Sequence, residues 1–336
     1  MRLSVLDQSP VISGHTPARA IHETIRLVKA AEQLGFHRYW LAEHHALAAL
    51  ADPCPEILLA RIAAETSKMR VGTGGVLLPY YSPFKVAEQF RMLEALYPGR
   101  IDLGIGRAPG GDQTTALAIG QGRYPGAEHF PEQVQYLVAY LDGTLPPDHP
   151  FAGVKVMPAG SGAPEIWLLG SSDYSGALAA QLGLRFAFAH FISADGGDAV
   201  MREYKRRYHP SDREPAPQGL LCVFVICADT VETAERLAAS IDLRRLNTDY
   251  GVNAPVPNLQ EAQSYPYTEA DRRRIAHHRR RVVLGTPEIV RDRLLALQEQ
   301  FQADELMAIT ITGDYDSRLR SYELLAESFK LGQRTG

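Results

Sequence analysis

Residues 38–45 read RYWLAEHH, an apolar run that ends abruptly in one carboxylate and two imidazoles. The aromatic and aliphatic side chains before Glu43 are typical of a buried β-strand. Glu43, His44 and His45 are titratable, and such groups are costly to bury without partners. At the carboxyl end of a strand in a parallel barrel, they can instead face a solvent-filled active-site cleft. The segment therefore predicts a barrel strand that delivers catalytic residues to the rim.

Strand-like and helix-like segments alternate along the rest of the chain. Eight apolar runs are predicted as strands, and most are followed by a stretch with helical spacing. The predicted strands cover residues 3–7, 38–45, 70–79, 100–106, 165–170, 185–191, 219–229 and 305–314. Strands separated by helices pair in parallel, and eight such units close naturally into a (β/α)8 TIM barrel. An open doubly wound sheet is the alternative, because one sequence does not reveal strand order.

Two segments interrupt the alternation within residues 1–336, which we expect to form a single domain. Residues 108–127 are rich in glycine and are predicted to be a long loop. Residues 247–280 form a polar insertion between the seventh and eighth strands and are a candidate lid. Near its end, residues 271–281 read DRRRIAHHRRR. This run predicts either a solvated helix or a closing element that screens an anionic cofactor.

Charge and cysteine content exclude several classes of protein. The formal net charge of −4 gives no overall basic field, so we expect no nucleic-acid partner and no binding to anionic membranes. The segment MRLSVLDQSP has no signal-peptide h-region, and no run approaches the length of a membrane span, so we expect a cytoplasmic protein. Three scattered cysteines make neither a disulfide framework nor a zinc site. Cys222 and Cys227 are predicted to be buried thiols on opposite faces of one strand.

Three further motifs fall at predicted strand ends. The sequence GIGRAPGG places Arg107 among glycines, where a guanidinium can bind a phosphate. LLGSSDYSG places Ser171, Ser172 and Ser175 at a strand-to-helix turn, which predicts either an anion site or ordinary helix capping. GTGG at 72–75 removes side chains from one strand, so that backbone can line a cavity for a flat ligand.

Together these motifs resemble the bacterial-luciferase-like flavin-dependent monooxygenases. The resemblance covers most of the chain and is densest in GFHRYWLAEHH, RVGTGGVLLPYYSPFKVAEQF, LYPGRIDLGIGRAPGGD and LLGSSDYSGALAAQLGL. The phrase YPGRIDLGIGRAPG is similar to the single-chain branch of that superfamily. Two positions depart from the luciferase catalytic subunit. Gly106 stands where luciferase has a reactive cysteine, and Ser171 stands where it has a glutamate.

The resemblance implies roles for individual residues. His44 is the implied catalytic base, His45 its supporting neighbour, and Glu43 the acidic member of the same motif. Arg107 and the three serines of the turn would bind the flavin phosphate. The Gly74–Gly75 peptide is implied to be cis.

The implied activity is that of a two-component monooxygenase. A separate reductase would supply reduced FMN, and this chain would use it with O2 to oxidise a small organic substrate, as a homodimer. One alternative is an F420-dependent oxidoreductase of the same superfamily that transfers hydride. Another is a flavin-binding protein without turnover. A metal-dependent barrel hydrolase built on the two histidines is disfavoured, because adjacent strand residues point apart, and we expect no metal.

Overall fold

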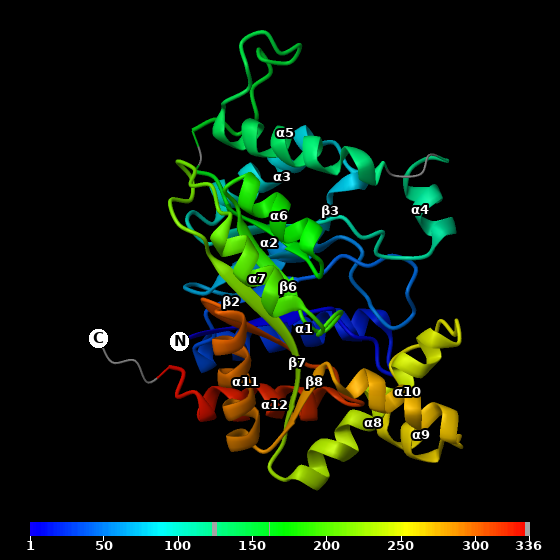
Figure 1. Cartoon of the computed structure of the whole chain (residues 1–336). Coiled ribbons are helices and arrows are strands. Elements are labelled where there is room, and N and C mark those ends of the chain that lie inside the picture. Colours follow the sequence, from blue (N-terminus) through cyan, green and yellow to red (C-terminus); the bar gives the residue numbers. More distant parts are fainter. Residues whose placement is uncertain (123–125, 161, 333–336) are drawn as a thin grey trace.

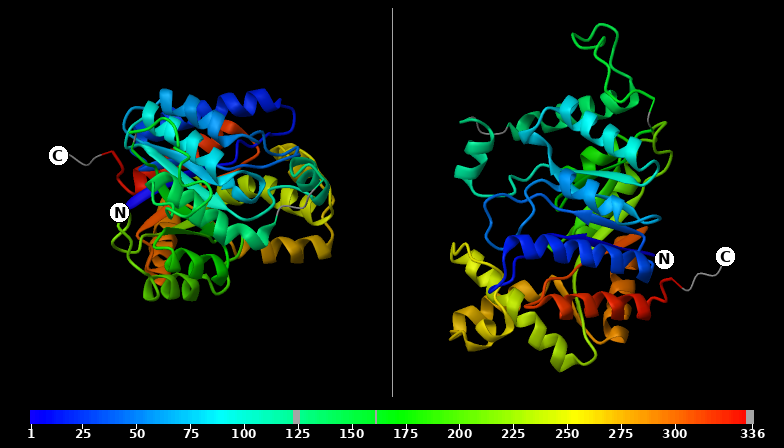
Figure 2. Two further views of the ribbon diagram at one scale, coloured as in Figure 1. Left: turned by 90° about the horizontal axis from the view of Figure 1, so that it is seen from above. Right: turned by 180° about the vertical axis from the view of Figure 1, so that it is seen from behind.

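The computed structural model of the chain describes residues 1–122, 126–160 and 162–332. Eight parallel strands close into a barrel, with helices around the outside of the sheet (Figures 1 and 2). The ring closes because β1 (Arg2–Asp7) pairs with both β2 (Arg38–Leu41) and β9 (Glu305–Ile309). β7 (Gly219–Cys227) joins β9 to β6 (Arg185–Ala189). This confirms the predicted TIM barrel over the open doubly wound sheet.

The remaining elements follow the predicted alternation. The other strands are β3 (Arg70–Leu77), β4 (Ile101–Gly106), β5 (Glu165–Gly170) and β8 (Val282–Gly285). The helices are α1 (Pro17–Leu34), α2 (Pro55–Ala64), α3 (Pro83–Leu96), α4 (Gln113–Ile119), α5 (Phe130–Asp142), α6 (Asp173–Gln181), α7 (Gly197–Arg206), α8 (Val231–Asp249), α9 (Leu259–Ser264), α10 (Glu269–Arg279), α11 (Pro287–Phe301) and α12 (Tyr315–Ser328). Short 3-10 turns lie at Leu78–Tyr80 and Ala127–His129.

Two of the sequence-based assignments need correction. β8 was not predicted; it pairs only with β7 and lies outside the ring. The predicted loop 108–127 contains α4, which begins after Asp112 because the Asp112 side chain accepts a hydrogen bond from the Thr115 amide at 2.7 Å. Residues 123–125 of that predicted loop lie outside the described residues.

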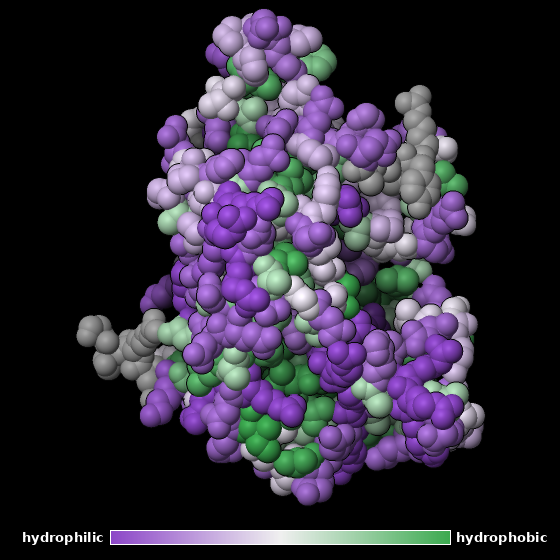
Figure 3. All heavy atoms as spheres, viewed as in Figure 1, coloured by the Kyte–Doolittle hydropathy of each residue, from purple (hydrophilic) through white to green (hydrophobic). Residues whose placement is uncertain are grey.

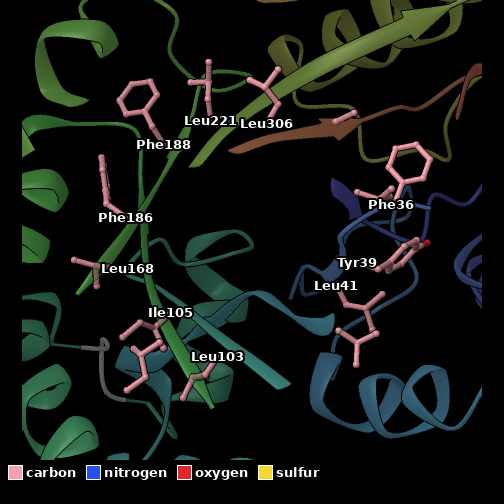
Figure 4. Close-up of a cluster of buried hydrophobic side chains, with 14 of the residues drawn as sticks. Phe36, Tyr39, Leu41, Leu103, Ile105, Leu168, Phe186, Phe188, Leu221 and Leu306 are labelled. Atoms are coloured by element: carbon pink, nitrogen blue, oxygen red, sulfur yellow. The ribbon is translucent and has the colours of Figure 1, made fainter. Parts of the chain in front are cut away.

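The outward-facing side chains of the strands form the main hydrophobic core. Tyr39 and Leu41 of β2, like the other residues labelled in Figure 4, lie between the strands and the surrounding helices. Cys227 belongs to this outer core, whereas Cys222 belongs to the inner one, and both thiols are buried. Their predicted placement on opposite faces of the strand is therefore confirmed.

The inward-facing side chains form layers along the barrel. At the amino-terminal end, buried Arg38 donates to Asp102 (2.6 Å) and to Glu305 (2.8 Å). The next layer holds Trp40 and Trp167, whose ring centroids lie 5.4 Å apart. The Arg38 guanidinium lies 4.9 Å from the Trp167 ring, so the two tryptophans separate this charged layer from the upper half of the barrel.

The insertion 247–280 docks on loops at the carboxyl-terminal end of the barrel. The Asn253 side chain donates to the Ala46 carbonyl and accepts from the Ala48 amide, both at 2.8 Å. Val256 bonds through its backbone to Val11, also at 2.8 Å. The insertion is helical, with α9 and α10 packed against α8. No helix of the described residues is both long and apolar enough to cross a membrane.

Candidate active site

A cavity of about 290 Å³ opens at the carboxyl-terminal end of the barrel. Figure 3 shows the surface hollowed on its right side, between the part that carries α4 and the part that carries α9 and α10. The apolar floor and walls come mainly from the inward faces of the strands, and the polar residues come from the strand ends. The cavity is lined by Glu43, His44, Gly74, Gly75, Arg107, Ser171, Ser172 and Ser175 among others. All of the candidate site residues singled out in the sequence except His45 and Gly72 therefore meet at one place.

His45 does not line the cavity. Its Nε2 atom lies 2.7 Å from a carboxylate oxygen of Glu43. Glu43 is buried and also accepts from the Leu77 amide (2.9 Å) and from the Tyr81 hydroxyl (2.6 Å). Glu43 thus ties the end of β2 to the end of β3 and fixes the backbone from which His44 projects.

His44 has the least satisfied side chain of the motif. Its Nδ1 atom is inaccessible to solvent and has no hydrogen-bond partner among the described residues. Burial, followed by the positive charge of Arg244, lowers the pKa of His44 to about 4. The imidazole is therefore neutral at pH 7. A neutral ring can accept a hydrogen bond or a proton from a bound molecule.

Arg107 lies beside the amino-terminal end of α6 at the cavity mouth. Its guanidinium stacks over the Tyr174 ring at 4.4 Å from the centroid, and it forms no ion pair with a described residue. The side chain of Ser172, the N-cap of α6, makes no capping hydrogen bond. Of the two interpretations of this turn, capping by Ser172 is therefore not observed. A free guanidinium next to the first amides of a helix is a site suited to an anion.

The glycines of β3 have two different functions. The Gly74–Gly75 peptide is cis, as the resemblance implied, and both residues line the cavity. Gly72 does not line it, which corrects the sequence-based expectation. A Cβ at Gly72 would lie 2.5 Å from the Asp102 Cβ and 3.0 Å from the Trp40 ring. This glycine instead allows close packing of the tryptophan and arginine layers.

Sequence reasoning missed two groups that shape the site. Tyr81 was not singled out, although its hydroxyl holds Glu43 in place. Arg244 of α8 lies in a segment that the sequence predicts only as an ordinary helix. Its spacing from buried neighbours was the one signal that could have indicated that it is partly buried. Among the described residues, no cluster of three or more His, Cys, Asp or Glu side chains could hold a metal ion.

Comparison with known proteins assigns the family. The model of the family "luciferase-like monooxygenase" matches residues 1–303. The chain belongs to this family. It is 45% identical to the uncharacterized protein YceB of Bacillus subtilis, over 98% of this chain and 99% of that protein. It is 34% identical to the N-acetyl-S-alkylcysteine monooxygenase of the same organism, over 99% and 100% of the two chains.

Several solved structures share the barrel. The crystal structure of apo-MsnO8 matches with a TM-score of 0.92 and 41% identity, over 99% of each chain. The oxygenating constituent of 3,6-diketocamphane monooxygenase from Pseudomonas putida, in complex with FMN, matches at 0.73 with 20% identity over 98% and 97% of the chains. An F420-dependent secondary alcohol dehydrogenase matches at 0.68 with 14% identity over 97% and 98%. At such low identity the last two show the fold alone.

Proposed function

We propose that this luciferase-like protein is an FMN-dependent monooxygenase that uses reduced FMN and O2 to oxidise a small organic substrate. One observation carries the proposal: an unpaired arginine beside a helix amino terminus and an unsatisfied, neutral histidine open onto the same apolar cavity. The first feature suits a terminal phosphate, and the second suits proton movement at a bound molecule. The full-length similarity to a named monooxygenase supports the same class of reaction.

The residues present fit FMN. Arg107, Ser171, Ser172 and Ser175 would hold the phosphate, because they surround the start of α6 at the cavity mouth. The cis Gly74–Gly75 segment, which presents backbone rather than side chains, would pack against the flat ring system. Leu6, Trp40 and Leu169 supply apolar walls that exclude water from it.

Reduced flavin, when bound, supplies the electrons that activate oxygen. The part of this chain is to orient the reactants, exclude water and manage a proton. His44 would accept a proton through its unpartnered Nδ1, and an anion bound nearby would raise its pKa and make it a better base. Glu43 would act as a positioning residue, because its carboxylate is fully used in holding Leu77, Tyr81 and His45.

Three finer proposals concern partners and motion. The chain lacks a dinucleotide-binding fingerprint, so a separate reductase would supply the reduced flavin.

Exposed apolar side chains on the adjacent helices α2 and α3, namely Ile57 (69% exposed), Met92 (53%) and Leu96 (57%), support a homodimer that forms through the outer surface of these two helices. The insertion 247–280, within one domain of residues 1–336, would act as the lid, since Asn253 anchors it to the loop after His44. Slower proteolysis of this insertion in the presence of FMN would support the lid.

FMN is favoured over F420, because two relatives that match almost the whole chain, at 36% and 34% identity, are named monooxygenases. Anaerobic titration with oxidised and reduced FMN and with oxidised and reduced F420 tests the assignment. We expect the tightest binding for reduced FMN, followed by oxygen uptake when air is admitted. A preference for F420 would favour hydride transfer. Binding of FMN without any oxygen-dependent product would favour a flavin carrier, and binding of neither cofactor would refute the proposal.

A further inference from the structure

Two sulfur-containing side chains lie next to each other in the wall of the cavity. Cys222 of β7 and Met307 of β9 both line it, and they are direct partners in the parallel pairing of these two strands. Both belong to the hydrophobic core inside the barrel, and both are buried from bulk solvent. A reactant therefore reaches either sulfur atom by way of the cavity.

The sulfur pair faces the glycines of β3 from the opposite side of the barrel. The ring runs from β3 to β7 through β2, β1 and β9 in one direction and through β4, β5 and β6 in the other. β3 and β7 are therefore opposite walls, and β9 is the neighbour of β7. A flat ring packed against Gly74–Gly75 would turn its second face toward Cys222 and Met307.

The two sulfur atoms differ in their reactivity toward peroxides. A thiol reacts as its thiolate, and burial raises the pKa of the Cys222 thiol, so this group stays protonated at neutral pH. A thioether has no proton to lose and is oxidised directly to a sulfoxide. Met307 is therefore the more reactive member of the pair.

The other methionines of the chain provide an internal comparison for Met307. Met69 and Met201 are buried in the outer core and do not line the cavity. The exposed methionines are Met1, Met92 and Met157. Within the described part of the chain, Met307 is the one methionine that lines the cavity. Oxidation from inside the cavity can thus be distinguished from oxidation by peroxide in bulk solution.

We propose that Met307 is a site of self-oxidation, at which peroxide formed in the cavity converts the thioether to a sulfoxide when no substrate takes up the oxygen. This inference rests on the proposed function, which supplies the reduced FMN and O2. Two electrons and two protons pass from reduced FMN to O2, which gives oxidised FMN and hydrogen peroxide. The Met307 sulfur then attacks one peroxide oxygen with a lone pair. The S–O bond forms, the O–O bond breaks, and the leaving hydroxide takes the remaining proton and departs as water.

The sulfoxide would change the wall that the flavin ring contacts. Met307 lies among apolar lining groups that include Leu6, Trp40 and Leu220. A polar S=O group in such surroundings costs free energy unless it finds a hydrogen-bond donor, so the ring should bind less tightly. Turnover without substrate would then limit itself by lowering the affinity for the flavin.

Peptide mapping by mass spectrometry tests this site on the wild-type protein. FMN is reduced photochemically under nitrogen, bound to the protein, and mixed in the dark with aerated buffer that contains catalase, which destroys peroxide that leaves the protein. A second sample receives hydrogen peroxide without flavin or catalase. Anaerobic titration of the same preparation with reduced FMN measures binding.

With catalase present, we expect roughly tenfold more sulfoxide at Met307 than at any other methionine, because its thioether lies beside the place where the peroxide forms. In bulk peroxide the order should reverse, with the exposed methionines oxidised first. The wild type oxidised in the presence of catalase should bind FMN roughly threefold more weakly than before the treatment.

Three variants separate Met307 from the other sulfur atoms. Met307→Leu removes the sulfur at similar volume and should keep its FMN affinity through the same treatment. Met201→Leu is the matched control, because Met201 is buried outside the cavity, and it should lose affinity as the wild type does. Cys222→Ala should also lose affinity, because the thiol is not the target.

An unmodified Met307 after O2 has consumed the bound reduced FMN would overturn the inference and leave the proposed function standing. The same holds for sulfoxide at Met307 no higher than at Met69 and Met201, or for protection of the FMN affinity by Cys222→Ala instead of Met307→Leu. If reduced FMN does not bind, the titration shows that the proposed function itself fails, and the self-oxidation fails with it.

Discussion

The two ends of the barrel differ in whether their buried polar side chains have partners. At the amino-terminal end, Arg38 is 1% exposed and bonds to Asp102 and Glu305, so its charge is fully matched. At the carboxyl-terminal end, His44 and Arg244 each have a buried nitrogen without a partner. Both ends are polar, and the tryptophan layer separates them. The difference indicates that polar groups at the first end stabilise the barrel, whereas those at the second end are arranged for ligands.

The largest expected effect on stability is at the amino-terminal end of the barrel. Arg38→Met would leave Asp102 and Glu305 buried without their counter-charge, and we expect a loss of about 3–5 kcal/mol in the free energy of unfolding. Urea denaturation at pH 7 measures this loss. Arg26→Gln is the control: it removes the ion pairs of a half-exposed arginine with Asp316 and Glu23 and should cost less than about 1 kcal/mol. Equal losses in the two variants would remove the distinction between buried and exposed pairs.

The next expected effect is a loss of stability at low pH that depends on His44. Because its folded-state pKa of about 4 lies below the usual 6.5, the unfolded chain takes up a proton first as the pH falls from 6.5 toward 4. The wild type should therefore lose about 2–3 kcal/mol more stability than His44→Gln between pH 7.5 and 4.5. Denaturant titrations at the two pH values give this difference.

Asp52 does not affect the comparison between the wild type and His44→Gln. Burial raises the pKa of Asp52 to about 7, so its contribution to stability has the opposite pH dependence. That carboxyl is present in both proteins, so its contribution cancels. Identical pH profiles for the wild type and His44→Gln would show that the imidazole titrates normally and is not held neutral by its surroundings.

Arg107 should matter for ligand binding and little for stability. Arg107→Gln is expected to weaken FMN binding roughly 30-fold, or about 2 kcal/mol, because it removes a charge-assisted contact with the phosphate. Riboflavin, which lacks the phosphate, serves as the control ligand and should bind the variant and the wild type equally. Fluorescence titrations measure both affinities. A parallel loss of riboflavin binding would indicate a role in shaping the cavity.

The smallest expected effect is on the free energy of unfolding, and its sign is opposite to that expected for Arg38→Met. Arg244→Met should leave the free energy of unfolding unchanged or raise it by about 1 kcal/mol, since a partly buried guanidinium without an acidic partner is replaced by an apolar side chain of similar length. The same urea experiment used for Arg38 measures it. A loss comparable to that of Arg38→Met would mean that Arg244 has a structural partner after all.

The sequence predicts the ring of the barrel and most of the site, because both depend on local signals. Strand ends such as LAEHH and GIGR can be recognised by an abrupt change from apolar to polar residues. The insertion was harder to predict. Asn258 and Thr268 precede its two helices as N-caps in complete capping boxes, but the helices lack an apolar face strong enough to mark them in the sequence.

Other features depend on contacts between distant parts of the chain. β8 is only four residues long and is defined by pairing with β7, which one sequence does not show. The burial of the Arg244 Nε atom likewise depends on the packing of α8 against β7, β8, α9 and α10. The pKa of His44 also follows from that packing, since burial and Arg244 together lower it. Such long-range effects leave no local pattern in the sequence.

The most direct test of the account is a crystal structure of the protein with FMN bound. We predict that the phosphate lies within hydrogen-bonding distance of Arg107 and of the serines at the start of α6, with the flavin ring against Gly74–Gly75 and near His44. A phosphate bound at Arg244 instead, or a flavin outside this cavity, would contradict the assignment of the open end of the barrel as a flavin-dependent active site.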